Sequence, residues 1–566
     1  MKTRLVALVA LAPLALGWTP SGIGFGGVAE VGPVGSSGTH TGSVVDVSDS
    51  LADTTVAQAG VDVVRDAEDD EFTSPNVTPV GSFPDLTVIS TEFATDEPVM
   101  YASTLTGIRT YDISDPTAPA LLGTLEMAMF QNENVKLGER EDGTKVLLVG
   151  FDAVGVTPSF EPTDVAGYDE IAVVDVTDPT APEITARIET NHRTHTVGCA
   201  NDECTHAFTS GDDAAFDVID LEELDAPEIV ATITDQPQED NEAFASGLGH
   251  DWDVDDAGVA WWVGTGGIIA YDVNDPTEPV ILNSSDKHSQ DPEWNSYVSH
   301  NSMRPNADDF GGDDEEGSRG GPPGHVPGPP AQRPTPGGAA GDAPGGPPDG
   351  SPGGGGTGDR IHVDEGNVLL VTEEDYMDAT CESEGSFQTW HVSDLDPSIN
   401  PEGEQDGGTI TPLDQWNSEL LGSGIKTPAG AFCSAHYFDY HQDGYVAQGW
   451  YQQGMRILDV NDPENIRQVG YWVTGVQETW GAYWVPEYDE DGNQTGDKTN
   501  LVYTNDPTRG LEVLEVDLPE ERGAARTVEA PVLQSWLQVD PTLAARAESS
   551  DFGSVCPLPP GSPVRG

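Results

Sequence analysis

The sequence predicts an all-β protein, a seven-bladed β-propeller of four-stranded antiparallel blades. Three observations carry this prediction. A motif of strand, Asp-Pro turn and strand recurs seven times along the chain. Each copy follows two further apolar, strand-like runs, and no helical periodicity intervenes. The 65 Gly and 44 Pro residues favour many turns over long helices.

The repeated motif ends an apolar strand at Asp-Pro and resumes with an alternating strand. The Asp carboxylate caps the turn, while Pro fixes φ and lacks the donor that a central strand needs. Four-stranded units recurring at intervals from about 45 residues are typical of propeller blades. The clear copies are YDISDPTAPALLGTLE (111–126), VDVTDPTAPEITARIE (174–189), YDVNDPTEPVILNSS (271–285) and LDVNDPENIRQVGYW (458–472), and the degenerate copies are 219–233, 391–401 and 514–525.

The strands of one unit can be assigned in order. Upstream of 271–285, DWDVDD predicts an innermost strand, and GVAWWVGTGG and GIIAYDV predict the two middle strands. HYFDY, GYVAQGW and MRILDV repeat this order upstream of 458–472. The strand after Asp-Pro is the outer one. Seven copies therefore predict seven blades over residues 83–541.

Segments outside the repeat have other compositions. Lys2, Arg4, the uncharged apolar run 5–16 and the small residues Ala15 and Gly17 predict a signal peptide over 1–17. Its twelve apolar residues are too few for a membrane-spanning helix. Residues 18–80 lack periodicity and are expected to be disordered. The stretch 305–360 holds 18 Gly and 12 Pro and is expected to be a disordered loop within the propeller, and 542–566 a flexible tail.

The charge is strongly negative, with 99 Asp+Glu against 23 Lys+Arg and a formal net charge of -76. Such a surface repels phosphates, so a nucleic-acid partner is excluded. We expect a halophilic protein, because concentrated salt screens the repulsion between carboxylates. An acidic protein adapted to ordinary salt is the alternative. With the signal peptide and no transmembrane segment, we expect a monomer that is secreted or associated with the cell surface.

Five cysteines in an exported chain suggest disulfides. Cys199 and Cys204 are close enough in sequence to bridge a β-turn. Cys381 and Cys433 lie in neighbouring units and form a second candidate pair, which leaves Cys556 over. The sequence does not fix the connectivity of these last three. No CxxC motif supports a redox or thiolate-metal role.

The repeat core resembles the LVIVD-repeat family of exported bacterial and archaeal propellers. The resemblance rests on IAVVDVTDP (171–179), IIAYDVNDP (268–276) and MRILDVNDP (455–463), and it covers most of residues 85–530. These are strand and turn positions, so they specify the fold rather than a reaction. The resemblance implies an exported propeller, often at the cell surface, without an assigned activity.

Histidine recurs at the start of the predicted innermost strand. Corresponding positions of propeller blades lie on a ring around the axis, so these side chains are expected to converge at the channel mouth. Neutral imidazoles grouped in this way suit a transition metal such as Cu(II), Zn(II) or Ni(II). The equivalent stretches of blades two and seven, ENVKL (133–137) and WGAYWV (480–485), lack the histidine, which predicts a one-sided site. The four candidate ligands, in blades three to six, are His195, His250, His300 and His436.

Three neighbours of these histidines, Asp251, Asn301 and Met303, are candidate supporting residues or further ligands. HNSM (300–303) followed by VLLVTEE (368–374) also resembles the His-Asn-x-Met and Thr-Glu strands of selenium-binding protein, or methanethiol oxidase. That family is a copper-dependent propeller, so this local resemblance implies copper. The alternative is structural: propellers often bury a histidine on an inner strand to bond an Asp or a backbone group without any ligand.

Other candidates are weaker. Glu373, Glu374 and Asp375 form an acidic cluster suited to Ca²⁺ or to acid–base chemistry, although a solvated face is the favoured interpretation. Trp480 beside Tyr483 is a candidate channel-lining pair for stacking on a ligand. The remaining histidines of the strand-like runs, His206 and His362, are interpreted as core or surface residues.

The favoured function is a non-enzymatic binding module whose partner is an unidentified protein, glycan or envelope polymer. No GxSxG, HExxH, Walker or dinucleotide motif supports standard nucleophilic or nucleotide chemistry. The alternative is a metal-dependent oxidoreductase, with copper at the four histidines. Whether the protein is an enzyme is left open at this point.

Overall fold

The computed structural model consists of seven antiparallel sheets, one for each predicted blade. All the residues that it describes belong to one compact unit, 56–566. They span residues 71–528, apart from 85–87, 105, 128–132, 152–169, 193, 212–213, 235–247, 286–293, 296–297, 308–359, 376–384, 394, 396–409, 418–433, 452, 475–476, 508 and 520. The predicted signal peptide, residues 18–70, most of the Gly/Pro-rich loop, residues 529–541 and the C-terminal tail lie outside this part.

Blades 1 to 5 each use four consecutive strands, in the predicted order from the innermost to the outer strand. Blade 1 comprises β3 (Val88–Phe93), β4 (Val99–Thr104), β5 (Gly107–Asp112) and β6 (Ala120–Glu126). Blade 2 comprises β7 (Val135–Glu139), β8 (Lys145–Phe151), β9 (Glu170–Asp175) and β10 (Glu183–Glu189). Blade 3 comprises β11 (Thr194–Cys199), β12 (His206–Gly211), β13 (Phe216–Asp220) and β14 (Glu228–Ile233). Blade 4 comprises β15 (Gly249–Val254), β16 (Val259–Gly264), β17 (Gly267–Asp272) and β18 (Val280–Ser284). Blade 5 comprises β19 (Val298–Met303), β20 (Val368–Glu374), β21 (Phe387–Val392) and β22 (Ile410–Trp416), and the short 3₁₀ helix η5 (Val363–Glu365) precedes β20.

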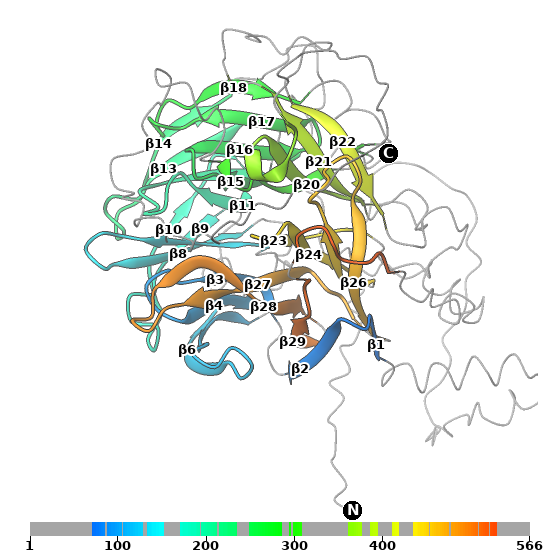
Figure 1. Cartoon of the computed structure of the whole chain (residues 1–566). Helices are drawn as coiled ribbons and strands as arrows, with labels where there is room; N and C mark the ends of the chain where they lie inside the picture. The colour runs from blue at the N-terminus through cyan, green and yellow to red at the C-terminus, as the bar shows by residue number, and fades with distance from the viewer. Residues whose placement is uncertain are drawn as a thin grey trace, which may run out of the picture. The chain divides into compact units, whose positions relative to one another are not determined.

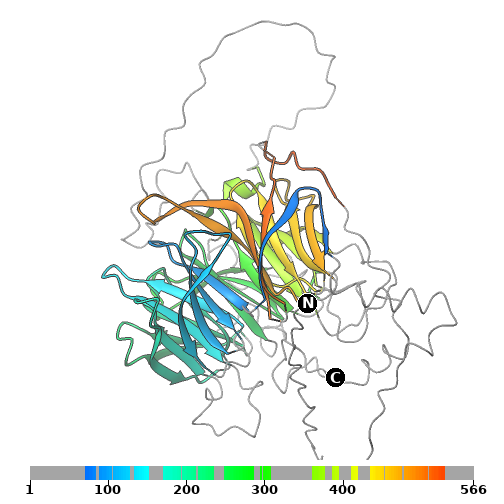
Figure 2. The same cartoon turned by 90° about the horizontal axis from the view of Figure 1, so that it is seen from below.

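The last two blades include strands from the N-terminal side of the chain. Blade 6 comprises β23 (Phe438–His441), β24 (Tyr445–Trp450), β25 (Gly454–Asp459) and β26 (Arg467–Thr474), with β1 (Glu71–Thr73) as a fifth strand. Blade 7 comprises β27 (Gly481–Tyr488), β28 (Gln494–Asp506) and β29 (Gly510–Val516), and β2 (Val77–Phe83) is its outer strand. Figures 1 and 2 show β2, in blue, beside the last strands of the chain.

These two strands correct the predicted domain boundary. Residues 71–80 belong to the propeller and not to a disordered segment, so the predicted start at Phe83 is too late. The pairing of β2 with β29 joins both ends of the described chain in one sheet and closes the ring of blades. Trp472 strengthens the attachment of β1, because its indole N–H donates to Glu71 Oε1 at 2.6 Å.

The core consists of seven apolar clusters, each between two neighbouring blades. Alternate residues of a strand point to opposite faces of its sheet. On β8, Leu147 and Val149 therefore pack against blade 1, while Val146 and Leu148 pack against blade 3. Both faces of the middle strands are buried, which explains why these strands read as continuous apolar runs. The clusters join blades 1–2, 2–3, 3–4, 4–5, 5–6, 6–7 and 7–1, so the ring is complete.

The Asp-Pro turns have the predicted chemistry. In blade 1, Asp112 Oδ1 accepts the backbone N–H of Ser114, and Asp115 Oδ1 accepts the N–H and the hydroxyl of Thr117. The same pair of Asp-centred turns recurs in blades 2 and 4. These carboxylates hold the turns.

Candidate metal centre

The four predicted histidines lie on a backbone irregularity that recurs at the start of the innermost strands. The pairing of β11 with β12 skips His195, that of β15 with β16 skips His250, and that of β19 with β20 skips His300. Each of these residues is therefore the extra residue of a β-bulge, which redirects its side chain. The inner strands β11, β15 and β19 follow one another around the ring, and Figure 1 shows β11 beside β15.

Blade 6 reproduces this geometry just before β23. The backbone of Gly449 bonds to both His436 N and Tyr437 O, as one residue facing a bulge does. A Cβ atom at Gly449 would lie 2.8 Å from Gly481 Cα, so glycine allows blade 7 to approach closely here. This approach brings the carbonyl oxygen of Trp480 within 2.7 Å of His436 Nδ1.

The four imidazoles converge on one carboxylate. The sequence predicted the convergence of the rings, but it did not predict the carboxylate. Ring centroids of successive histidines are 4.8, 3.9 and 4.0 Å apart. Glu133, just before β7 of blade 2, lies at their centre and is fully enclosed. The distances from its carboxylate oxygens to the four Nε2 atoms are 2.7 Å (His195), 3.5 Å (His250), 2.9 Å (His300) and 3.1 Å (His436).

A second carboxylate, Glu374 at the end of β20, faces the same cluster. Its oxygens lie 3.9 to 4.0 Å from the Nε2 atoms of three of the histidines, and Tyr451 donates its hydroxyl hydrogen to Oε1. The predicted solvated face is wrong for this acidic stretch, because Glu373, Glu374 and Asp375 are all buried. Of the three, Glu374 faces the histidines, whereas Glu373 Oε2 accepts the N–H of Ser386.

The hydrogen positions on two rings follow from their partners. Trp480 O can only accept, so His436 Nδ1 carries a hydrogen and directs Nε2 into the cluster. His300 Nδ1 likewise faces the amide oxygen of Asn301 at 3.3 Å. The Nε2 atoms of both rings face Glu133 Oε1, at 2.9 Å from His300 and 3.1 Å from His436. A carboxylate can only accept, so each of these contacts needs a cation, either a proton or a metal ion, between nitrogen and oxygen.

Two buried atoms of the cluster have no hydrogen bond. His436 Nε2 and Glu374 Oε2 are fully buried, lie in one cluster and lack a hydrogen-bond partner. Unsatisfied buried polar atoms are rare, and an ion is one of the standard explanations. The donor set therefore fits a metal ion: imidazole nitrogens with a carboxylate are the ligands that Cu, Zn and Ni accept. The cluster contains three sets of three side chains that could hold one ion. In each set, the three ligand atoms lie within 4.8 Å of one another.

The electrostatics favour a carboxylate at Glu133 and neutral imidazoles at His250 and His300, which are the forms that bind a metal ion. Burial alone would raise the pKa of Glu133, but the charges of His195 and His250 and the hydrogen bonds of the cluster hold it well below its ordinary value. Burial and the nearby His300 hold the pKa of His250 well below its ordinary value. Burial and His436 lower the pKa of His300 to about 4. Burial, with the charge of Glu133, raises the pKa of Glu374 well above its ordinary value.

The flank formed by blades 6, 7 and 1 is aromatic and apolar. Tyr451 and Trp480 lie with their ring centroids 4.9 and 5.0 Å from that of His436, and Ile89 packs against both. The cluster is therefore one-sided, as predicted, except that blade 2 supplies Glu133. Tyr451 also has a φ of +22°, in a region that non-glycine residues rarely adopt. The other residue of the predicted stacking pair, Tyr483, is only partly buried and folds over Gly481.

The three predicted supporting residues have different surroundings. Asn301 contacts His300 and accepts the hydroxyl hydrogen of Thr372, so it orients a candidate ligand. Asp251 Oδ1 accepts a hydrogen bond from the Asn134 amide at 3.0 Å. Among the described residues, no hydrogen bond or ion pair is seen between Asp251 and an imidazole of the cluster. Met303 packs against the apolar cluster between blades 5 and 6, so it is not a ligand.

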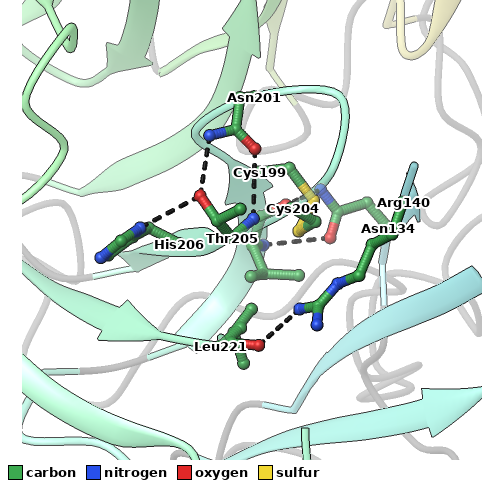
Figure 3. Close-up of a disulfide and its surroundings, with 9 residues drawn as sticks. Asn134, Arg140, Cys199, Asn201, Cys204, Thr205, His206 and Leu221 are labelled. Carbon is green, nitrogen blue, oxygen red and sulfur yellow. Dashed lines mark hydrogen bonds between the residues drawn. A yellow bond between two sulfur atoms is a disulfide. The ribbon is translucent and has the colours of Figure 1, made fainter. Parts of the chain in front are cut away.

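The remaining sequence candidates lie outside the cluster. His206, on β12, bonds the hydroxyl of Thr205 at 3.2 Å, and His362 accepts the N–H of Asp364 at the start of η5. The predicted disulfide between Cys199 and Cys204 is present at the turn between β11 and β12, where Asn201 bonds Thr205 twice (Figure 3). Cys381, Cys433 and Cys556 lie outside the described residues.

Comparison with known proteins supplies no function. No protein-family model matches the sequence, and neither does any curated protein. The β-propeller domain of Cps50 (Swd1) from Myceliophteria thermophila is 10% identical with a TM-score of 0.45, and the match covers 78% of this chain and 100% of that domain. A chain of the mitotic checkpoint complex is 8% identical with a TM-score of 0.40, over 80% and 96% of the two chains. The propeller fold therefore rests on the sheets themselves, and both family resemblances stay predictions. Among the described residues, no helix has the length and apolarity needed to cross a membrane.

Proposed function

We propose that this chain is an exported metalloprotein that binds a transition-metal ion at the propeller axis and uses it for redox chemistry. A single observation carries the proposal: four buried imidazoles and a carboxylate, from five consecutive blades, bring their ligand nitrogen and oxygen atoms together in one place. A purely structural cluster would place a donor opposite each acceptor. Here His436 Nε2 has none, and a metal ion would satisfy it.

The ligands in this proposal are the four histidines and Glu133. Glu374 lies about one angstrom farther than Glu133 from His300 and His436, so we assign it to the surroundings of the ion and not to its first ligands. Asn301 and the carbonyl oxygen of Trp480 hold the Nδ1 sides of two rings, which is how proteins orient metal-bound histidines. These contacts favour the metal interpretation over four independent core histidines.

Copper is the metal that we favour. Imidazole-rich sites bind Cu(II) more tightly than the other divalent ions of the first transition row, and a bound copper supplies one-electron chemistry. The second reason for favouring copper is the aromatic flank, because the rings of Tyr451 and Trp480 lie against the proposed ligand His436. A binding module without a metal is the alternative. Among the described residues, the exposed large apolar side chains lie on the outer strands of four different blades and form no single docking patch: Val80, Leu121, Val230 and Val280.

The test is elemental analysis of protein exported by a host grown in molar salt. We expect close to one copper per chain in the wild type, and loss of most of it in His250→Ala and His300→Ala. His206→Ala is the matched control, because this histidine lies outside the cluster and should leave the metal content unchanged. Circular dichroism checks that each variant is folded. Substoichiometric metal that does not respond to the two cluster variants would reject the proposal, and one zinc per chain would reject its redox part.

A further inference from the structure

A polar cleft of about 640 Å³ opens on blades 5 and 6. Its walls come from three separate parts of the chain: the residues around η5, the Asp-Pro turn after β25, and the pair Arg522 and Gly523. None of its lining residues belongs to the candidate metal centre. The cleft therefore needs an explanation of its own.

Three guanidinium groups line this cleft, although the chain has more than four acidic residues for each cation. Arg522 is held by Asp364 through two bonds of 2.7 and 2.8 Å. Arg467 is held by Asp459 and by the carbonyl oxygens of Gly523 and Ala525. These bonds fix the two side chains as rigid parts of the wall.

Arg360 is different from the other two. It is exposed, and no carboxylate among the described residues forms an ion pair with it. The guanidinium groups of Arg360 and Arg522 both lie near His362: burial lowers the pKa of His362, and these two charges lower it further, against the effect of Asp364. The cleft thus combines fixed positive charge with one guanidinium that is available to bind.

Two residues of the cleft depart from the repeat. Blade 6 has Asn465 three residues after the Asp of its Asp-Pro turn, and Arg467 two residues later. The clear copies in blades 1, 2 and 4 have at the first position Ala118, Ala181 and Glu278, and at the second Ala120, Glu183 and Val280. The turn therefore forms without Asn or Arg, and the scaffold does not require either residue here.

We propose that this cleft binds an acidic sugar, namely a uronic acid unit of an anionic polysaccharide. A guanidinium pairs with a carboxylate through two parallel hydrogen bonds, which suits Arg360. The amides of Asn461 and Asn465 can donate and accept, as sugar hydroxyls require. Asp364 and Asp462 add acceptors for hydroxyl hydrogens, and among the described residues Arg360 is the lining guanidinium that has no ion-pair carboxylate, which suits a ligand with one carboxylate.

The strong negative charge of the chain does not prevent this binding in concentrated salt. At about 1 M salt the Debye length falls to about 3 Å, so repulsion by distant carboxylates is screened while direct contacts persist. Inorganic sulfate and hydrogen phosphate fit less well, because a doubly charged anion would meet two lining carboxylates. The proposal does not depend on the metal centre.

The test is calorimetric titration of the full chain, in molar KCl, with trigalacturonic acid. Two variants probe the cleft: Arg360→Gln removes the available guanidinium, and Asn465→Ala restores the residue that blades 1 and 2 carry. We expect each to raise the Kd, Arg360→Gln by at least about tenfold, as loss of a charge-assisted hydrogen bond implies. Glu278→Ala, at the matching turn position of blade 4, is the control and should not change the Kd.

Two further ligands decide the chemistry. A neutral galactose oligomer of similar length should bind at least about tenfold more weakly than the uronate, because it lacks the carboxylate. Inorganic sulfate should not compete with the uronate at equal concentration. Absence of uronate binding at millimolar concentration, equal binding of the neutral oligomer, effective competition by sulfate, or a Kd unchanged in both cleft variants would each overturn the proposal.

Discussion

Blades 3 to 6 and blade 1 share a backbone feature at the axis but differ in the side chain that it presents. In blades 3, 4 and 5 the extra residue of the bulge is a histidine, and blade 6 has the same arrangement. In blade 1 the pairing of β3 with β4 shifts at the same place, yet the residues there are Ile89 and Ser90. Blade 7 begins its inner strand beside Trp480. The bulge therefore recurs in blades 1 and 3 to 6, whereas the pairing of β7 with β8 in blade 2 has no such shift, and blade 1 shows that the histidine is not needed to form it.

This comparison separates scaffold from chemistry. A structural histidine copied with the repeat would be expected in all blades, including those whose bulge is occupied by other residues. Instead, four neighbouring blades have histidine, blade 2 has Glu133, and the remaining flank is apolar. Grouping of ligands on one side of the axis is what a single metal site requires. The first prediction tests this grouping most strongly.

Glu133→Gln should reduce metal affinity by at least about 100-fold, because even outer contacts of metal sites typically change affinity 10- to 100-fold. The same variant should raise the melting temperature of the metal-free protein, since an amide can donate to an imidazole lone pair where a carboxylate cannot. Competition with a chelator and thermal melts of the metal-free form measure the two effects. A variant that keeps its metal, or that is less stable than the metal-free wild type, would contradict the account.

Salt concentration should change the stability that depends on the exposed charges, but it should not change metal binding at the buried axis. Between 0.2 and 3 M KCl we expect the melting temperature to rise by at least about 10 °C, because screening relieves repulsion among the carboxylates. Metal affinity should stay nearly constant over this range, because the ligands are buried. Calorimetry and chelator competition at matched salt concentrations provide both readings. A flat melting temperature would support the ordinary acidic protein, and a salt-sensitive affinity would argue against a buried site.

Tyr451→Phe should destabilise the protein by about 1–3 kcal/mol, because it leaves the buried Glu374 carboxyl group without its hydroxyl donor. Metal content should be unchanged, since the four histidines and Glu133 keep their contacts. Denaturant unfolding and elemental analysis check these points. Tyr503→Phe is the matched control: it removes a hydroxyl that bonds a backbone carbonyl away from the centre, and we expect a smaller loss of stability. Equal losses in both variants would remove the special role of Tyr451.

The raised pKa of Glu92 predicts the direction in which stability changes with pH. Burial raises its pKa from 4.5 to about 7, so the folded protein keeps a proton that the unfolded chain releases between these values. Its contribution to stability is therefore complete below pH 4.5 and is lost as the pH rises through 7. Glu92→Gln should be more stable than the wild type at pH 8 by about 1 kcal/mol, less than the full shift because the side chain is only partly buried. Curves of stability against pH that run parallel for the wild type and Glu92→Gln would contradict this prediction.

The sequence allowed the blades and the histidines to be predicted because both repeat. Seven Asp-Pro copies indicate seven sheets, and equivalent positions in a closed ring must converge. Glu133 was missed although it lies in the stretch aligned with the histidines, because one acid among 99 carries no signal. β2 was missed because its partner strand β29 lies more than 400 residues away. Met303 was misplaced because proximity in sequence to His300 does not tell which face of the strand a residue occupies.

The most direct test of the central claim is X-ray absorption at the metal edge of the natively exported protein. The account predicts one copper ion per chain surrounded by nitrogen and oxygen atoms at about 2.0 Å, with the multiple-scattering pattern of several imidazoles. The same spectrum from His300→Ala should lose part of the imidazole signal. A protein without a metal edge, or a metal bound by sulfur, would contradict the account.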